Sequence, residues 1–219
     1  MASKEKNSNP LWDATDYKVL IPNPGILTPT AKAWVVATGD DKYFSDPEVA
    51  NKFKEAATML ASKEWVFRNV NHTKTILSDT LASVEGLKTE NYIPWKSPQT
   101  NHVKDVVLSQ PTIYAYRLGI YGHSKFLSQK AAARALYATR VHSLFGQSTN
   151  SAVGLVLCYN ETGDTGLKDS EGKNIDFKVL GIMSFYLKLI EPINKEKEHI
   201  KVINLKNEDA LDKLKLFLE

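Results

Sequence analysis

Two cationic side chains stand where a parallel sheet would place a ligand. Arg68 and Lys96 lie at the ends of two predicted neighbouring strands, residues 64–69 and 91–95. In open α/β sheets ligands bind outside the carboxyl ends of the strands, so both charges can grip a phosphate or a carboxylate there. An ordinary surface charge explains either residue equally well. Trp95 can stack on a base, although a core anchor is the more common role for such a residue.

A second candidate for chemistry is the pair His72 and Asp79, which lie seven residues apart in a polar stretch. They can form an acid/base pair, but a histidine on the surface of a polar loop is the more common outcome. The five histidines and the one cysteine show no metal-ligand spacing. We therefore expect no metal site and no bound cofactor.

The one cysteine, Cys158, lies in an apolar run, which favours a buried thiol over a nucleophile. A single cysteine excludes a disulfide within the chain and fits a reducing compartment. The polar residues 1–10 lack the apolar core of a secretory signal. Since no apolar stretch approaches the ~18 residues of a membrane span, we expect a cytoplasmic protein without a membrane segment.

Three further features could bind an anion or a nucleic acid. Residues 163–166 (Gly-Asp-Thr-Gly) can form a small anion-binding turn, and a plain surface turn explains them as well. Arg134 and Arg140 on a predicted long helix can face DNA, but a solvated helix face is more common. A stripe for single-stranded DNA needs cations among aromatics; the one candidate is Tyr114, Tyr116, Arg117, Tyr121 and Lys125. A net charge of +3 is too small to indicate a nucleic-acid partner.

The elements that would position these residues alternate between strand and helix. The predicted strands are residues 33–38, 64–69, 91–95, 152–159 and 200–205. The first predicted helix begins at Asp46-Pro47, and the others cover residues 76–87, 124–145, 176–189 and 207–218. Residues 97–123 are expected to be loop plus helix. This alternation predicts an α/β, Rossmann-like three-layer fold: a mostly parallel five-stranded sheet in the order 3-2-1-4-5, with residues 33–38 central and helices on both faces.

The domain organisation follows from length and composition. The 219 residues, 42% of them hydrophobic and 24% charged, suffice for one ordinary globular core. Four prolines within residues 1–32 predict an irregular leader, whose apolar pieces should pack on the body. Residues 33–219 are expected to form a single Rossmann-like domain.

Several segments, in order and spacing, resemble the SLOG superfamily, the Rossmann-like domains related to DNA-processing protein A and to the "lonely guy" phosphoribohydrolases. The resemblance is strongest to the small members of bacteria and their phages, and it spans residues 33–218. It rests on residues 38–40 (Thr-Gly-Asp), 65–68 (Trp-Val-Phe-Arg), 92–96 (Tyr-Ile-Pro-Trp-Lys), 138–141 (Ala-Thr-Arg-Val) with Gly146, 155–159 (Leu-Val-Leu-Cys-Tyr) and 200–205 (Ile-Lys-Val-Ile-Asn-Leu).

The sequence departs from this family at both phosphate-binding loops. The family's second strand runs into a glycine-rich loop, whereas residues 69–78 here contain no glycine and only Asp79 is retained. The family's fourth strand leads to a glycine-rich turn, whereas residues 163–166 here are followed by an insertion. Small glycines let backbone N–H groups approach a phosphate, so the usual phosphate cradle should not form unchanged.

The resemblance implies binding of a nucleotide-derived or other small anionic ligand, and the altered loops imply that catalysis is absent. The alternatives are a protein-interaction module with a degenerate site, a nucleoside-monophosphate N-glycosidase, and single-stranded DNA binding. SLOG domains commonly pair, which implies a homodimer. The residues expected to bind the ligand are Thr38, Gly39, Arg68, Asn69, Asp79, Trp95, Lys96, Gly163 and Thr165.

Overall fold

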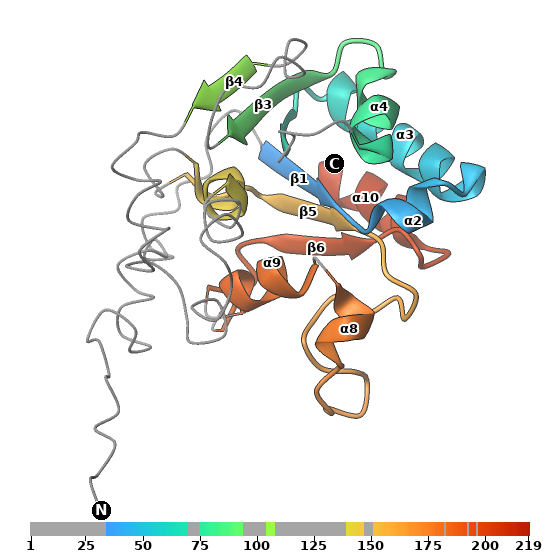
Figure 1. Ribbon diagram of the computed structural model, residues 1–219, viewed down its shortest axis with the longest axis vertical. Helices are drawn as coiled ribbons and strands as arrows, with labels where there is room; N and C mark the ends of the chain where they lie inside the picture. Colours follow the sequence, from blue (N-terminus) through green and yellow to red (C-terminus); the bar gives the residue numbers. More distant parts are fainter. Residues whose placement is uncertain are drawn as a thin grey trace, which may run out of the picture.

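The computed structural model describes residues 34–69, 75–93, 104–107, 139–146, 151–181, 183–191, 193–195 and 197–219. The predicted leader lies outside these residues, and so do His72, Trp95, Lys96, Arg134 and the tyrosine-rich segment 114–125. The chain folds around one sheet with helices on either side (Figure 1).

The sheet has six strands in the order β4-β3-β2-β1-β5-β6, and every neighbouring pair is parallel. The strands are β1 (Trp34–Thr38), β2 (Val66–Asn69), β3 (Lys88–Ile93), β4 (Lys104–Val107), β5 (Leu155–Cys158) and β6 (Lys201–Asn204). The predicted parallel sheet, its order 3-2-1-4-5 and the central place of the first strand are confirmed.

Strand β4 is an addition to the predicted five strands. It pairs with β3 at the edge of the sheet and comes from residues 97–123, which the sequence predicted as loop plus helix. The strand starts with Lys104 and Asp105, so its sequence contains no apolar run that would predict it. Edge strands often carry charge, which is why a search for apolar runs misses them.

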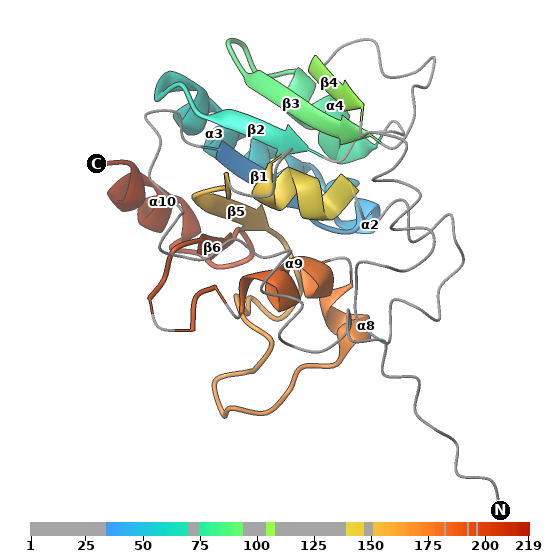
Figure 2. The ribbon, with the colours of Figure 1, turned by 90° about the vertical axis from the view of Figure 1, so that its left-hand side faces the viewer.

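Side chains alternate across the sheet and build two cores. Val35 and Ala37 face the helices α2 (Asp41–Phe44), α3 (Pro47–Ser62), α4 (Ile76–Ala82) and α10 (Ala210–Leu218). Val36 and Val156 face the helical residues 139–145 and α9 (Met183–Ile190). Figure 2 shows these helices on the two sides of the sheet. The predicted three-layer arrangement is confirmed.

Helix α3 begins as its sequence indicates. The Asp46 carboxylate accepts a hydrogen bond of 2.9 Å from the Glu48 backbone N–H, and Pro47 occupies the first helical position. The buried side of α3 has the spacing expected for one apolar helix face; it consists of Val49, Phe53, Ala56, Ala57 and Leu60.

The C-terminal helices differ from their predicted bounds. The predicted helix 176–189 is divided into α8 (Phe177–Leu180) and α9, because Gly181 at the junction has a φ of +52° that a continuous helix does not allow. The last helix starts at Ala210 rather than at Asn207, because the Asn207 side chain bonds the Gly163 carbonyl instead of capping the helix.

Candidate functional site

The predicted ligand crevice lies at the carboxyl ends of β1 and β5, where the chain leaves β1 toward β2 and leaves β5 in the opposite direction, toward β6. Such a switch point is the usual ligand site of an open parallel sheet. Thr38 ends β1 in register with Cys158, the last residue of β5, and its side chain is buried. Gly39 follows beneath the ring of Phe44, which would lie 3.0 Å from a Cβ at that position. Both predicted residues therefore lie at the switch point, where Thr38 is buried and Gly39 is half-buried.

Asp40 fills the position next to them. A Cβ added at Gly181, just before α9, would come within 2.5 Å of Asp40 Oδ2, so the carboxylate lies directly against this backbone. Helix N-termini attract negative charge, and in nucleotide-binding folds that charge is the ligand's phosphate. Here the protein supplies its own carboxylate, which would repel an incoming anion.

A network of asparagines closes the carboxyl ends of β5 and β6. Asn160 and Asn204 are each 1% exposed. The Asn160 side chain accepts from Thr162 Oγ1 and from the Gly163 N–H, both at 2.9 Å, and donates to the Asp164 carbonyl at 3.0 Å. Asn204 Nδ2 donates to the same Asp164 carbonyl at 3.0 Å. These donors and acceptors bond each other and leave little capacity for a ligand.

The predicted turn 163–166 belongs to this network. The Gly163 carbonyl accepts from Asn207 Nδ2 at 3.0 Å, which ties the turn to the segment after β6. Thr165, two residues further, lines a groove along β6 instead of the switch point. The turn is thus a structural link between β5 and β6.

Arg68, the central residue of the predicted site, is buried inside the protein with 3% of its surface exposed. Its Nη1 donates to the Ser151 carbonyl at 2.5 Å, and its guanidinium lies 4.2 Å from the ring centre of Trp34. Its Nε lies 3.8 Å from Glu90 Oε1, and Tyr92 donates to the same Glu90 carboxylate. Burial lowers the pKa of Arg68, while Tyr92 and Glu90 act in the opposite direction.

The Arg68 side chain points away from the carboxyl ends of the strands. Trp34 is the first residue of β1, and Ser151 precedes the first residue of β5, so both contacts lie toward the amino edge of the sheet. The expectation of a solvated charge at a strand end is wrong. The long side chain bends back over the sheet, where an aromatic ring and a backbone carbonyl compensate for lost hydration.

Of the remaining predicted residues, Asn69 and Asp79 lie on separate elements of the described structure. Asn69 ends β2 in register with Asn91. Asp79 is exposed on α4, on the opposite side of the sheet from the Arg68 guanidinium. Trp95 and Lys96 lie outside the described residues. Arg140 is half-buried, with its guanidinium 5.2 Å from the ring centre of Phe185.

Cys158 is fully buried, as the sequence predicted. Its Sγ lies 3.4 Å from the Ile203 carbonyl oxygen, and burial raises the pKa of the thiol. A protonated, enclosed thiol is a poor nucleophile. Among the described residues no group of histidine, cysteine, aspartate and glutamate side chains could hold a metal ion.

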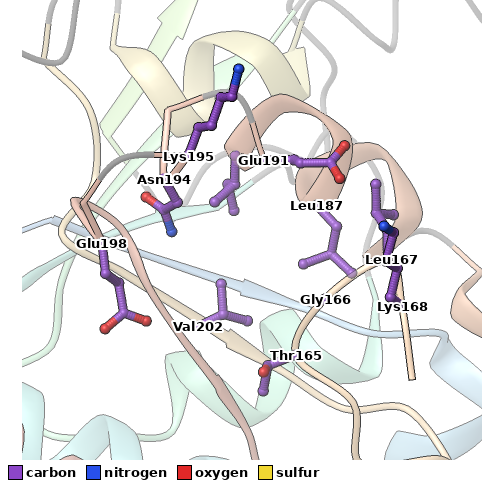
Figure 3. A pocket seen from close by; sticks show the side chains of 11 residues that line it. Thr165, Gly166, Leu167, Lys168, Leu187, Glu191, Asn194, Lys195, Glu198 and Val202 are labelled. Atoms are coloured by element: carbon purple, nitrogen blue, oxygen red, sulfur yellow. The ribbon is translucent and has the colours of Figure 1, made fainter. Parts of the chain in front are cut away.

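An open groove of about 390 Å³ follows the outer side of β6, and we call it the edge groove. Figure 3 shows Leu187 of α9 and Val202 of β6 on its floor, with Thr165 and Lys168 on one wall and Asn194 and Lys195 on another. Its volume falls within the usual range for ligand sites, roughly 300–1,000 Å³. No residue except Thr165 connects this groove with the predicted site.

Strand β6 offers free backbone groups to this groove. Lys201 and Leu205 donate their N–H groups to Gly154 and Cys158 on the β5 side, at 2.9 and 2.8 Å. In a strand the backbone groups alternate in direction, so the N–H and C=O of Val202 point outward. Within the described ranges no residue hydrogen-bonds to them. Unpaired edges of this kind can accept an additional strand.

The sequence contains a weak sign of this groove. Residues 194–199 form a charged insertion before the last predicted strand, and charged residues commonly flank a sheet edge. The edge groove itself could not be predicted from the sequence, because its walls come from three segments that only the fold brings together: residues 165–168, α9 and residues 194–198.

Comparison with known proteins adds no relative. No family model, no curated protein and no solved structure matches this chain. The resemblance to the SLOG superfamily therefore stays a prediction. In the described part of the chain no helix has the length and apolar character needed to cross a membrane.

Proposed function

We propose that this protein is a non-catalytic interaction module that binds an extended peptide segment along the outer edge of β6. The observation that carries the proposal is the edge groove, where the outward backbone N–H and C=O of Val202 border an open, partly apolar cavity. An extended peptide can hydrogen-bond to such an edge and place alternate side chains in the adjoining groove.

The charges around the edge groove support a peptide with acidic character. Glu198 is engaged by Lys201 at 3.0 Å. Lys168 and Lys195 form no ion pair with any residue that the structure describes, and the same holds for Glu191, which also lines the groove. The unpaired groups thus carry an excess of positive charge.

Binding of a small anion at the switch point has less support. Arg68 is used internally, and Asp40 and the asparagine network occupy the carboxyl ends of β1, β5 and β6. The N-glycosidase alternative has even less support, because Asp79 and Arg68 lie on opposite sides of the sheet. The tyrosine-rich segment that would bind single-stranded DNA lies outside the described residues.

The test is a selection from a random peptide library, followed by affinity measurements on two variants. Val202→Pro removes the outward N–H without removing a bond to β5, and proline is tolerated on edge strands. Val202→Thr keeps the N–H and nearly the same shape. We expect selected peptides to lose about tenfold in affinity to the proline variant, roughly one hydrogen bond, and to bind the threonine variant nearly as well as the original.

Two results would contradict the proposal. One is equal affinity of the selected peptides for both Val202 variants, provided that both keep the melting temperature of the unchanged protein. The other is a thermal-shift screen in which nucleotides or ADP-ribose-like compounds stabilise the protein and peptides do not. That second result would restore the switch point as the functional site.

A further inference from the structure

A second groove lies on the other side of β6, and we call it the α10 groove. It has a volume of about 360 Å³ and lies between the segment before β6 and the last turns of α10. Leu216 and Phe217 line it, although their side chains are 73% and 39% exposed. These two neighbouring side chains leave apolar surface beside the groove that a partner can cover.

The polar rim of the α10 groove is predominantly basic. Of the described residues that line it, His199, Lys201 and Lys213 are basic and Glu198 is acidic. The two lysines are held in surface ion pairs, Lys201 with Glu198 at 3.0 Å and Lys213 with Asp209 at 2.9 Å. Exposed pairs of this kind are weak, so an incoming carboxylate can share these cations.

The two grooves are connected through β6 itself. Val202 lines the edge groove and its neighbour Lys201 lines the α10 groove, while Glu198 borders both. Successive side chains of a strand point to opposite faces. A segment that pairs with β6 would therefore direct its side chains alternately into the two grooves.

We propose that the partner is an extended segment in which apolar and acidic residues alternate. This inference rests on the proposed strand addition at β6. The apolar side chains enter the edge groove and pack on its floor of Leu187, Ile190 and Val202, while Lys168 and Lys195 on its walls attract the carboxylates of the segment at longer range. The acidic side chains enter the α10 groove, where their methylene groups pack on Leu216 and Phe217 and their carboxylates meet His199, Lys201 and Lys213.

Defined peptides test this pattern on the full chain. The first, blocked at both ends, is Glu-Val-Glu-Val-Glu, and its matched control is Lys-Val-Lys-Val-Lys, with the same apolar residues and length. A third, Glu-Ser-Glu-Ser-Glu, keeps the charge and removes the apolar side chains. We expect the first peptide to bind at least about fivefold tighter than either control, the order of one surface charge pair or one partly buried side chain.

Two variants in α10 decide whether the charge preference comes from the groove. Lys213 and Lys215 both form surface ion pairs on this helix, but only Lys213 lines the groove. We expect Lys213→Glu to abolish the preference for the acidic peptide and Lys215→Glu to retain most of it. An equal effect of both variants would overturn the inference, because it would indicate general attraction to a basic surface.

The outcomes separate this inference from the proposed function. If the acidic and basic peptides bind with equal affinity and both lose affinity for the Val202→Pro variant, strand addition stands and the alternating pattern is wrong. If the acidic peptide binds Val202→Pro as well as the original protein but loses affinity for Lys213→Glu, binding of acidic side chains in the α10 groove stands and strand addition is wrong. If no defined peptide binds, or if Val202→Pro changes the oligomeric state because the occupant is a second copy, the partner inferred here is wrong.

Discussion

Arg68 and Lys168 are both cations beside strands of one sheet, yet the fold treats them differently. Arg68 on β2 is 3% exposed and has contacts with Trp34, Ser151 and Glu90. Lys168 lines an open groove beside β6 and is in no ion pair with the described residues. Buried cations must be compensated where they lie, so Arg68 serves the fold. A solvated cation needs no compensating protein contact, because water surrounds its charge, and it remains available to a partner.

The same contrast holds between the two regions that could bind a ligand or a partner, the switch point and the edge groove. At the switch point, the Asp40 carboxylate lies against the Gly181 backbone, and the asparagine side chains are bonded to the neighbouring backbone. Along β6, the backbone of Val202 and two lysines remain unused by the described residues. Substitutions in the first region should therefore change stability, and substitutions in the second should change binding alone.

The largest effect is expected for Arg68→Ala. A charge-assisted hydrogen bond contributes about 1.5–3 kcal/mol and a desolvated cation–π contact up to about 2 kcal/mol, so unfolding should become easier by about 3–4 kcal/mol. Urea denaturation measures this change. Lys88→Ala is the control, because Lys88 is an exposed cation paired with Glu64, and its effect should stay within about 0.5 kcal/mol. Similar values for both variants would break the comparison.

Next in size is Asn160→Ala. It would remove the buried Asn160 side chain from the Gly163 N–H and the Asp164 carbonyl, which are both half-buried, and the loss of these two bonds costs about 2–3 kcal/mol. Asn174→Ala, at an exposed position on the loop after β5, should cost less than about 0.5 kcal/mol. Thermal unfolding of the two variants compares a bonded asparagine with a solvated one, and equal melting temperatures would contradict the closed network.

A smaller effect separates two glycines with the same backbone conformation. Gly163 and Gly172 both have a φ of +78°, but an added Cβ would lie 2.3 Å from Asn207 Oδ1 at Gly163 and would meet nothing within 4 Å at Gly172. Gly172→Ala should cost about 1 kcal/mol for its backbone alone, and Gly163→Ala about 1 kcal/mol more for the lost Asn207 bond. In an Asn207→Ala background the difference should vanish; its persistence would show that Asn207 does not close this turn.

The smallest effect on stability is expected in the edge groove. Lys168→Glu and Lys195→Glu should each change the free energy of unfolding by less than about 0.5 kcal/mol, because both positions are solvated. Each should still weaken an acidic peptide by up to about fivefold, since an exposed ion pair contributes 0.2–1 kcal/mol. Isothermal titration with the selected peptides measures this. A loss of stability comparable to that of Arg68→Ala would erase the contrast between the two regions.

The sequence by itself determined the layered architecture of this protein. Apolar runs at residues 33–38 and 152–159 predicted two strands, the first of them central, and the structure places β1 and β5 side by side in the centre. The apolar spacing from Val49 to Leu60 and the Asp46-Pro47 start predicted α3. These features are local or periodic, so they can be read without knowing what surrounds them.

Only the tertiary structure decided what the polar residues do. In the sequence Arg68 looks like any cation at a strand end. The position of its guanidinium depends on Trp34 and Ser151, which are distant in the chain. The backbone at Gly181 lies against Asp40, which is distant in the sequence, and the edge groove depends on β6 being the last strand of the sheet. Periodicity records which side of an element is apolar. Whether a charge is buried, bonded or free is set by residues far away in sequence, because polar groups are satisfied by whichever partner the fold brings to them.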